Sequence, residues 1–237
     1  MALQIYAAGG IVRNLIDAFL PHRGLTLAPR GLAREGAART FTEDEIISDM
    51  EQFSYVRLDA LRAAPRGARD WVVVLILSAT GKYSHHSPDL RKLLDGIETE
   101  RAAKEGRLDE LIVVAERAFF AKSNLMDIIR DVQQRQPGGA DLRGSAPFCS
   151  AIPYYVFSYN LPLSRSVPPH RLLSPAEVEA LLRRERRKHH DLPVIFTSDP
   201  PVVWNGWREG GVVEIMRPSQ TAGRAVYWRR IEKGGFS

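Results

Sequence analysis

A group of prolines divides the chain into a longer N-terminal part and a shorter C-terminal part. Pro162, Pro168 and Pro169 lie close together, and proline neither continues a helix nor pairs within a central strand. The 237 residues of the chain are enough for two folded parts. We therefore expect two domains, one over residues 1–161 and a smaller one over residues 162–237.

The longer part alternates helical patterns with short apolar runs. Apolar residues recur every four positions over residues 11–20, which predicts a helix that Pro21 and Gly24 end. The unbroken apolar run at residues 72–77 and the segment Glu110–Ala115, which is apolar after its first residue, predict two buried strands. The aromatic-rich segment 152–159 is typical of a third strand.

Capping residues mark helix starts between these runs. Thr42-Glu43-Asp44-Glu45 forms a capping box, Ser87-Pro88 combines a capping serine with a proline suited to the first turn, and Ser123 can cap a further helix. Helices that alternate with strands indicate an α/β domain.

The shorter part predicts one helix followed by a small sheet. Ser174-Pro175-Ala176-Glu177 is a capping box with proline in the first turn, and Val178, Leu181 and Leu182 form its apolar face. Short strands are expected around residues 194–196, 212–216 and 226–231, with turns at 199–201, 210–211 and 222–223. The expected fold class is α/β (α+β), an α/β domain followed by a small helix-plus-sheet domain.

Positive charge is concentrated in the shorter part. Residues 162–237 carry thirteen basic and eight acidic residues, so the whole formal net charge of +5 lies there. Residues 183–190 read Arg-Arg-Glu-Arg-Arg-Lys-His-His, which suits nucleic acid. A solvated or partner-facing helix end, whose cations complement the helix dipole, is the interpretation that the sequence favours. Trp204, Trp207 and Trp228 are either core residues or a protein-facing surface.

Several classes of protein are excluded or disfavoured. The single cysteine, Cys149, rules out an internal disulfide and disfavours a structural zinc site. The longest apolar run, residues 71–77, is too short for a bilayer, which needs about 20 residues, and the N-terminus does not resemble a signal peptide. His85-His86 and His189-His190 are adjacent pairs whose side chains diverge on a strand, so we expect no metal and no cofactor.

Enzyme motifs are weak. The chain has neither a Gly-x-Ser-x-Gly nucleophile elbow nor a phosphate-binding loop of the Walker type. A metal-dependent nuclease would need Glu-x-Lys on the second strand, but Glu116-Arg117-Ala118 lacks the lysine, and Asp70 fits a surface flank better than a ligand. A nuclease therefore remains a third hypothesis with little support.

The C-terminal residues resemble one family in order and spacing. It is the fifth-largest subunit shared by the three eukaryotic nuclear RNA polymerases, whose C-terminal part alone corresponds to a small subunit of the archaeal polymerase. The resemblance rests on residues 167–170, 192–195, 198–200, Gly206, Gly210, 212–215 and 217–224.

The rest of the chain is similar to the African swine fever virus type of this subunit. That likeness includes residues 81–83, 85–86, 93–94, 110–112, 127–129, 152–154 and 198–204, and it is poor over the first 65 residues.

The resemblance implies a non-catalytic subunit of a multisubunit DNA-directed RNA polymerase. In this family the N-terminal domain forms part of a jaw beside downstream double-stranded DNA, the C-terminal domain docks on the largest subunit, and catalysis belongs to the two largest subunits. It implies no cofactor and no membrane. A viral member would work in host cytoplasmic factories and be carried in the virion, and a cellular one would be nuclear. The alternative is a free DNA-binding or host-interaction module that has left the polymerase.

The resemblance also assigns site residues. Those near DNA in the jaw are Lys122, Ser123 and Asn124. Those at the assembly interface are His170, Asp199, Pro200, Trp204, Arg217, Ser219, Thr221, Gly223, Arg224 and Arg229. No catalytic or metal-binding residue is expected.

Overall fold

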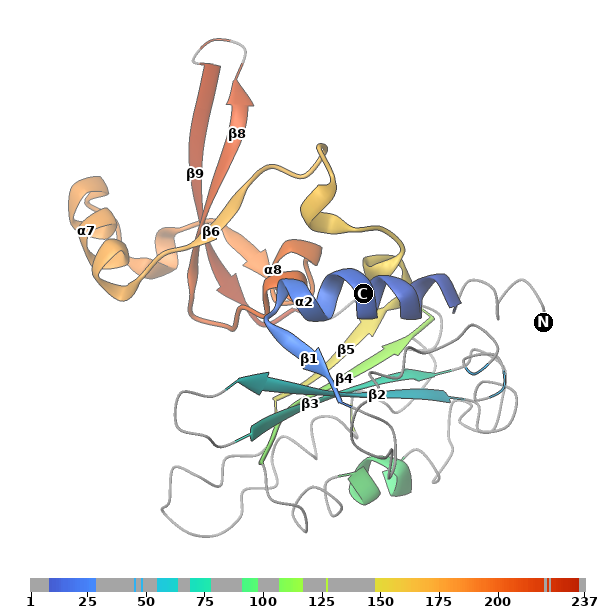
Figure 1. Cartoon of the computed structure of the whole chain (residues 1–237). Helices are drawn as coiled ribbons and strands as arrows, with labels where there is room; N and C mark the ends of the chain where they lie inside the picture. The colour runs from blue at the N-terminus through green and yellow to red at the C-terminus, as the bar shows by residue number, and fades with distance from the viewer. Residues whose placement is uncertain are drawn as a thin grey trace, which may run out of the picture. The chain divides into compact units, whose positions relative to one another are not determined.

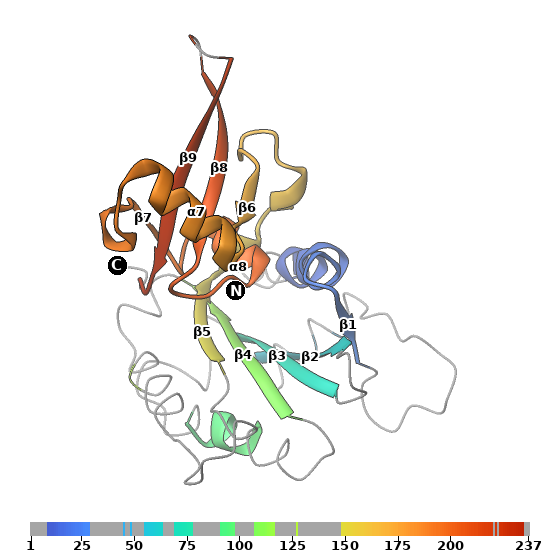
Figure 2. The same cartoon turned by 90° about the vertical axis from the view of Figure 1, so that its left-hand side faces the viewer.

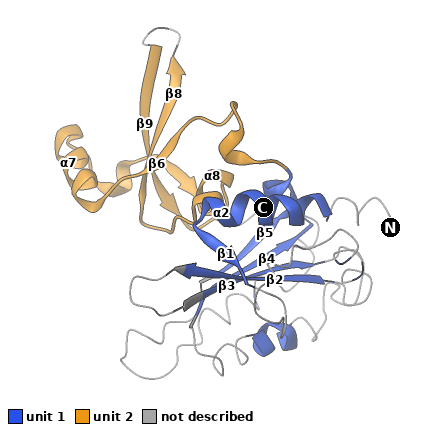
Figure 3. Ribbon diagram, viewed as in Figure 1, with its two compact units in different colours: residues 1–158 blue, residues 159–237 orange. Residues whose placement is uncertain are grey.

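The chain separates into two compact units, residues 1–158 and 159–237, in the computed structural model (Figure 3). The structure describes residues 9–28, 45, 48, 55–63, 69–77, 91–97, 107–116, 127, 148–219, 221 and 223–234. Each unit has a sheet of its own, and helices accompany both sheets, which confirms the α+β class. The helix starts expected at residues 87–88 and 123 lie outside the described residues, whereas Glu45 and Ser48 are both helical.

The first unit contains a five-stranded mixed sheet with the order β1-β2-β3-β4-β5 (Figure 1). The strands are β1 (Leu25–Leu27), β2 (Tyr55–Ala63), β3 (Arg69–Leu77), β4 (Arg107–Ala115) and β5 (Phe148–Pro153). Pairing is antiparallel from β1 to β3 and parallel from β3 to β5. Parallel neighbours need crossover connections, and helical residues 91–97 lie in the first crossover.

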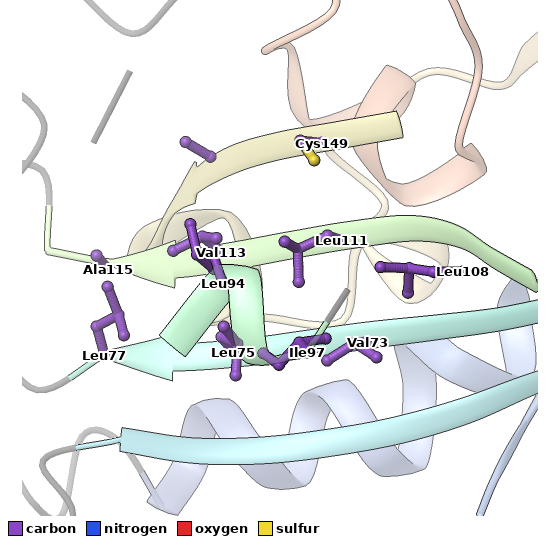
Figure 4. Packing of buried hydrophobic residues seen from close by; sticks show 11 residues of the cluster. Val73, Leu75, Leu77, Leu94, Ile97, Leu108, Leu111, Val113, Ala115 and Cys149 are labelled. Atoms are coloured by element: carbon purple, nitrogen blue, oxygen red, sulfur yellow. The ribbon is translucent and has the colours of Figure 1, made fainter. Parts of the chain in front are cut away.

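Both faces of the central strands are buried, which explains their unbroken apolar runs. Val73, Leu75 and Leu77 pack with Leu94 and Ile97 of the helix at residues 91–97 (Figure 4). The alternate residues 72, 74 and 76 point to the opposite face and are also fully buried, and Figure 1 shows the N-terminal helix on that side of the sheet. The Cys149 side chain belongs to the first of these two cores.

The N-terminal helix runs past the proline that was expected to end it. Residues 9–22 are helical, with a π turn at η1 (Leu15–Phe19) followed by α2 (Leu20–His22), so Pro21 lies inside the last turn. The Leu20 N–H bonds to the Leu15 carbonyl, and this wider turn gives room to the proline ring. The helix ends at His22, and Gly24, the other residue expected to end it, follows with a φ of +65°.

Two further expectations for the first unit need correction. The sequence pattern missed β1 and β2, whose residues lack a run that is continuously apolar. The expected strand at residues 152–159 ends at Pro153, and the aromatic residues after it form a 3-10 helix, η2 (Tyr154–Phe157). Proline at the strand end removes a ladder donor, and Tyr154 turns back so that its hydroxyl donates to the Leu77 carbonyl. Burial raises the pKa of this tyrosine, and the charge of Glu116 adds to the rise.

The second unit contains a four-stranded sheet with the order β6-β8-β9-β7. Its elements are η3 (Leu161–Leu163), β6 (His170–Leu172), α7 (Pro175–Glu185), η4 (His189–Asp191), β7 (Val194–Phe196), α8 (Pro200–Asn205), β8 (Val212–Ser219) and β9 (Gly223–Glu232). β8 pairs antiparallel with both β6 and β9, whereas β7 runs parallel to β9.

A helix covers each face of this sheet. Leu181 of α7 packs with Val212, and Trp228 lies against the same cluster, while Figure 2 shows α7 lying across the sheet. Val202 of α8 packs against the opposite face with Val213 and neighbouring core residues. The expected apolar face of α7 is confirmed.

The ends of α7 follow from its sequence. The Ser174 hydroxyl accepts from the Glu177 N–H at 3.3 Å, and the Glu177 carboxylate accepts from the Ser174 N–H at 2.8 Å, so the predicted capping box is present. These hydrogen bonds to Ser174, joined by an ion pair with Arg171, lower the pKa of Glu177 to about 2. Such a cap contributes about 1 kcal/mol. At the other end Arg186 is left-handed, with a φ of 51°, and the Arg187 N–H closes the last turn on the Leu182 carbonyl.

The segment expected to be a turn at residues 199–201 starts a helix instead. Asp199 is the N-cap of α8, and Pro200 and Pro201 occupy the first turn, where their missing N–H groups leave no intrahelical bond unmade. Val202, Val203 and Trp204 then face inward, so their burial extends the turn into a helix. Gly206, with a φ of +65°, ends it.

Candidate docking surface

The β8–β9 hairpin extends beyond the strands on either side of it. β6 pairs only with residues 213–215 of β8, and β7 pairs only with residues 230–232 of β9. The hairpin itself continues to the pair Ser219 and Gly223, and Figures 1 and 2 both show it running on past its neighbours. Gly223 has a φ of +67°, which suits the tight connection at the tip.

The two outer edges of this hairpin differ. On the β9 side the Arg230 N–H bonds to the Pro193 carbonyl, so the alternate residues Trp228, Val226 and Arg224 direct their backbone groups to the same edge. Within the described part of the chain these backbone groups have no strand beside them. On the β8 side the corresponding position is Pro218, which has no N–H to offer. The β9 edge is therefore the one able to receive another strand.

The strand register gathers several of the assigned residues on one face. His170 is opposite Ile215, which is opposite Tyr227, and residues opposite one another share a face. Alternation places Arg217 and Arg229 on that face as well. We call the set His170, Arg217, Tyr227 and Arg229 the hairpin face.

The hairpin face is basic and carries an exposed aromatic ring. The Arg217 guanidinium lies 5.4 Å from the centre of the Tyr227 ring, and Tyr227 is 49% exposed. Arg229 donates to the Val194 carbonyl at 3.0 Å, which holds its chain along the sheet. The hairpin face thus combines a fixed cation with a ring available for contact.

His170 is held in a fixed orientation at the edge of this face. Its Nδ1 lies 2.6 Å from the Pro168 carbonyl. Burial lowers the pKa of His170, and Arg217 and Arg229 lower it further, while the Pro168 bond and Asp199 oppose the change. The ring is therefore neutral at pH 7, and the charge of the hairpin face comes from its arginines.

Other assigned residues have different places in the unit. Trp204 is 0% exposed and belongs to the interior, so its side chain is not part of the surface of this chain. Asp199 accepts from the Phe196 N–H at 2.8 Å and, together with Pro200, starts α8. Ser219 and Thr221 lie at the hairpin tip with their hydroxyl oxygens 3.4 Å apart.

Arg224 lies on the opposite face of the hairpin. Its guanidinium is 3.9 Å from the Met216 sulfur, and both residues alternate with those of the hairpin face. Lys122, Ser123 and Asn124 lie outside the described residues, so their assignment to the jaw stays a prediction.

Sequence reasoning missed Val226 and Tyr227 as surface residues. They are 40% and 49% exposed, although adjacent apolar residues in a strand usually face two cores. The length of the hairpin could have predicted their exposure. β7 pairs only with residues 230–232 of β9, so Val226 and Tyr227 lie in the part of the strand that β7 does not cover.

The first unit contains a buried group of charged side chains. Arg23 forms a two-pronged ion pair with Glu110, with nitrogen–oxygen distances of 3.2 and 2.8 Å. The two side chains are 5% and 4% exposed. Arg62 lies 3.2 Å from Asp109 and 3.8 Å from Glu110. These ion pairs join the residue that follows the N-terminal helix to β4, so they serve to hold the first unit together.

The described residues contain no cluster of three or more His, Cys, Asp or Glu suited to a metal ion. His189 lies 3.2 Å from the Gly210 carbonyl and His190 lies 3.3 Å from Asp191, so each of these imidazoles has its own partner.

Glu116, the residue considered for a nuclease, is exposed just after β4. Among the helices described, none is both long and apolar enough to cross a membrane.

The small helix-and-sheet unit is of a kind found in subunits of multisubunit RNA polymerases. Residues 159–231 match the family described as RNA polymerase Rpb5, C-terminal domain. The chain is 38% identical over 162 residues to the DNA-directed RNA polymerase RPB5 homolog of an African swine fever virus isolate from a Kenyan pig. That match covers 68% of this chain and 73% of the relative.

Further relatives support the same conclusion. The corresponding protein of a Namibian warthog isolate of the virus is 39% identical over the same length, with the same coverage of 68% and 73%. The DNA-directed RNA polymerase subunit Rpo5 of Thermococcus onnurineus is 51% identical over 65 residues, which cover 27% of this chain and 79% of the archaeal protein. The chain belongs to the RPB5 family of DNA-directed RNA polymerase subunits. This confirms the resemblance recognised in the sequence.

Proposed function

We propose that this protein is a non-catalytic subunit of a multisubunit DNA-directed RNA polymerase that docks on the largest subunit through residues 162–237. The observation that carries the proposal is the hairpin face, where Arg217 lies against the exposed ring of Tyr227. Arginine and tyrosine are the side chains that most often dominate the binding energy of protein interfaces. The two largest subunits supply catalysis in this proposal, and the chain needs no cofactor.

The hairpin offers two modes of contact to a partner subunit. Its face presents an aromatic ring and arginines, which can form bidentate bonds with carboxylates of the partner. Its β9 edge presents backbone groups to which an extended segment of the partner could add as a strand. Both depend on the part of the hairpin that lies beyond β6 and β7.

We propose that the N-terminal domain, residues 1–161, contributes to the jaw beside downstream double-stranded DNA. Lys122, Ser123 and Asn124 are the residues assigned to that contact by family resemblance. A lysine beside the expected start of a helix suits a phosphate group, and backbone contacts permit DNA to slide because they do not read its sequence.

The proposed location follows the origin of the polymerase. Since the matches to African swine fever virus proteins cover 68% of this chain, a viral enzyme is the natural setting. Such an enzyme would act in cytoplasmic factories of the infected cell and be carried in the virion. A cellular enzyme would place the protein in the nucleus.

Affinity purification tests the proposal as a whole. The tagged full chain, expressed in its native setting, is expected to recover the two largest polymerase subunits in stoichiometric amounts, measured by quantitative mass spectrometry. The alternative, a free DNA-binding or host-interaction module, predicts a chain that elutes without them. Recovery without polymerase subunits would contradict the assembly proposal and favour that alternative.

The jaw assignment has a separate test in the assembled enzyme. Lys122→Ala is expected to lower the slope of log affinity against log salt for downstream DNA by about 0.9, because one phosphate contact releases about that many counterions. The measurement is a salt titration of the purified polymerase with and without the substitution. An unchanged slope would remove Lys122 from the jaw contact.

A further inference from the structure

The C-terminal end of α7 carries a group of cations that the proposed docking surface does not use. This basic cap consists of Arg183, Arg184, Arg186, Arg187 and Lys188, all of them exposed. α7 packs on the face of the sheet that carries Val212 and Trp228, whereas the hairpin face is the opposite one. A partner seated on the hairpin face would therefore leave the basic cap free.

The first two arginines of the basic cap already have structural roles. Arg183 pairs with Glu179 one turn earlier in the helix. Arg184 lies 3.0 Å from Glu185 and 5.3 Å from the centre of the Trp228 ring. They shield the end of α7 and its contact with the sheet.

The other three cations have no such role. Arg186, Arg187 and Lys188 form no ion pair with any residue that the structure describes. The acids on either side have other partners: Glu185 pairs with Arg184, and Asp191 accepts from the backbone N–H of Lys188 at 2.8 Å and contacts His190. Three neighbouring positive side chains thus face solvent together without neutralisation, and the whole net charge of the chain lies in the same unit.

The backbone at Arg186 has a conformation that is unfavourable for a residue with a side chain. A left-handed residue after a helix is usually glycine, because a side chain in that conformation is strained. Arg186 is the one non-glycine residue with positive φ in the described chain. A glycine would end α7 with less strain, so Arg186 stands at a position that the backbone conformation alone does not favour.

The chemistry of the basic cap favours a polyanion over a folded protein partner. Protein interfaces are anchored by buried apolar side chains, but none of the exposed large hydrophobic side chains in the described chain lies between residues 173 and 195. Arginines that no acid neutralises suit phosphates, to which they can donate two bonds at once. The contact would be sequence-blind and sensitive to salt.

We propose that the basic cap of α7 binds the phosphate backbone of nucleic acid through Arg186, Arg187 and Lys188. This site is separate from the jaw and from the hairpin face. It gives the C-terminal unit a nucleic-acid contact besides its proposed docking role.

A salt titration with matched variants tests the site. The full chain and its triple variant Arg186→Gln, Arg187→Gln, Lys188→Gln are titrated with a labelled DNA duplex of mixed sequence, followed by fluorescence anisotropy. Loss of three phosphate contacts is expected to lower the salt slope by about 2.7. The control triple variant Arg165→Gln, Arg208→Gln, Lys233→Gln removes three exposed charges elsewhere in the unit and is expected to keep the slope. Equal slopes for the two triple variants would overturn the proposal.

Two further measurements exclude a general charge effect and a folding defect. Labelled polyglutamate is expected to bind the full chain at least about ten times more weakly than the duplex, because its charge density is lower. Equal affinity would overturn the assignment to nucleic acid. Arg186→Gly is expected to raise the melting temperature by about 2 °C while weakening duplex binding. An unchanged affinity in that variant would remove Arg186 from the contact.

Discussion

Tyr227→Ala is expected to weaken association with the largest polymerase subunit by about 30-fold or more. The ring is 49% exposed and lies under Arg217, so it is accessible and held in place before a partner arrives. Tyrosines in such positions commonly contribute about 2–4 kcal/mol to binding, and about 2 kcal/mol corresponds to 30-fold. Arg217→Glu, which reverses the charge above the ring, is expected to have an effect at least as large because it also repels the acidic groups proposed on the partner.

The chain offers a matched control for this experiment. Tyr159 is 42% exposed in the same unit but lies outside the hairpin, so Tyr159→Ala is expected to leave association unchanged. Recovery of the largest subunit is measured from the tagged full chain, and a thermal melt of each variant shows that the fold is kept. Equal recovery with Tyr227→Ala and Tyr159→Ala would contradict the role of the hairpin face while leaving family membership untouched.

The sequence could predict elements whose pattern is local. The buried strands at residues 72–77 and 110–115 were predicted because central strands covered on both faces are apolar at nearly every position. The start of α7 was predicted because Ser174 and Glu177 complete a capping box between near neighbours. These signals depend on residues close together in the chain.

Elements that depend on distant residues were missed. β2 alternates apolar and charged residues and becomes a strand because it pairs along its whole length with β3. The helix α8 was interpreted as a turn because Asp199-Pro200-Pro201 suits both, and only the core that receives Val202 and Trp204 decides between them. The N-terminal helix continued past Pro21 because a π turn relieved the expected clash.

The candidate site was predictable only through resemblance. The excess positive charge lies in the C-terminal part, but composition alone left nucleic acid, an acidic partner and mere solubility open, and it did not separate the two basic surfaces of that unit. Strand register puts Arg217 and Arg229 on one face and Arg224 on the other, and a one-residue shift would exchange them. The register of β8 against β9 depends on the turn at Gly223 and on pairing with β6 and β7. These contacts come from separate segments of the chain, so no single segment predicts the register.

The buried ion pair of the first unit provides the largest expected change in stability. Glu110→Gln is expected to lower the free energy of unfolding of that unit by about 3 kcal/mol, because Arg23 keeps its charge in a site where it is only 5% exposed. Asp59→Asn is the matched control. Asp59 pairs with Arg57 at 2.9 Å, but those side chains are 28% and 21% exposed, so the expected loss is below about 1 kcal/mol.

A double substitution separates the cost of an unpaired charge from the contribution of the pair itself. Arg23→Met combined with Glu110→Leu is expected to recover most of the stability that Glu110→Gln loses, because apolar side chains of similar volume need no partner in a buried site. Arg62 would keep Asp109 as its partner at 3.2 Å, so the double variant leaves that pair in place. Thermal unfolding followed by far-ultraviolet circular dichroism measures each variant. A double variant as unstable as Glu110→Gln would mean that the ion pair itself stabilises the join between the N-terminal helix and β4, because removing both charges would then restore nothing.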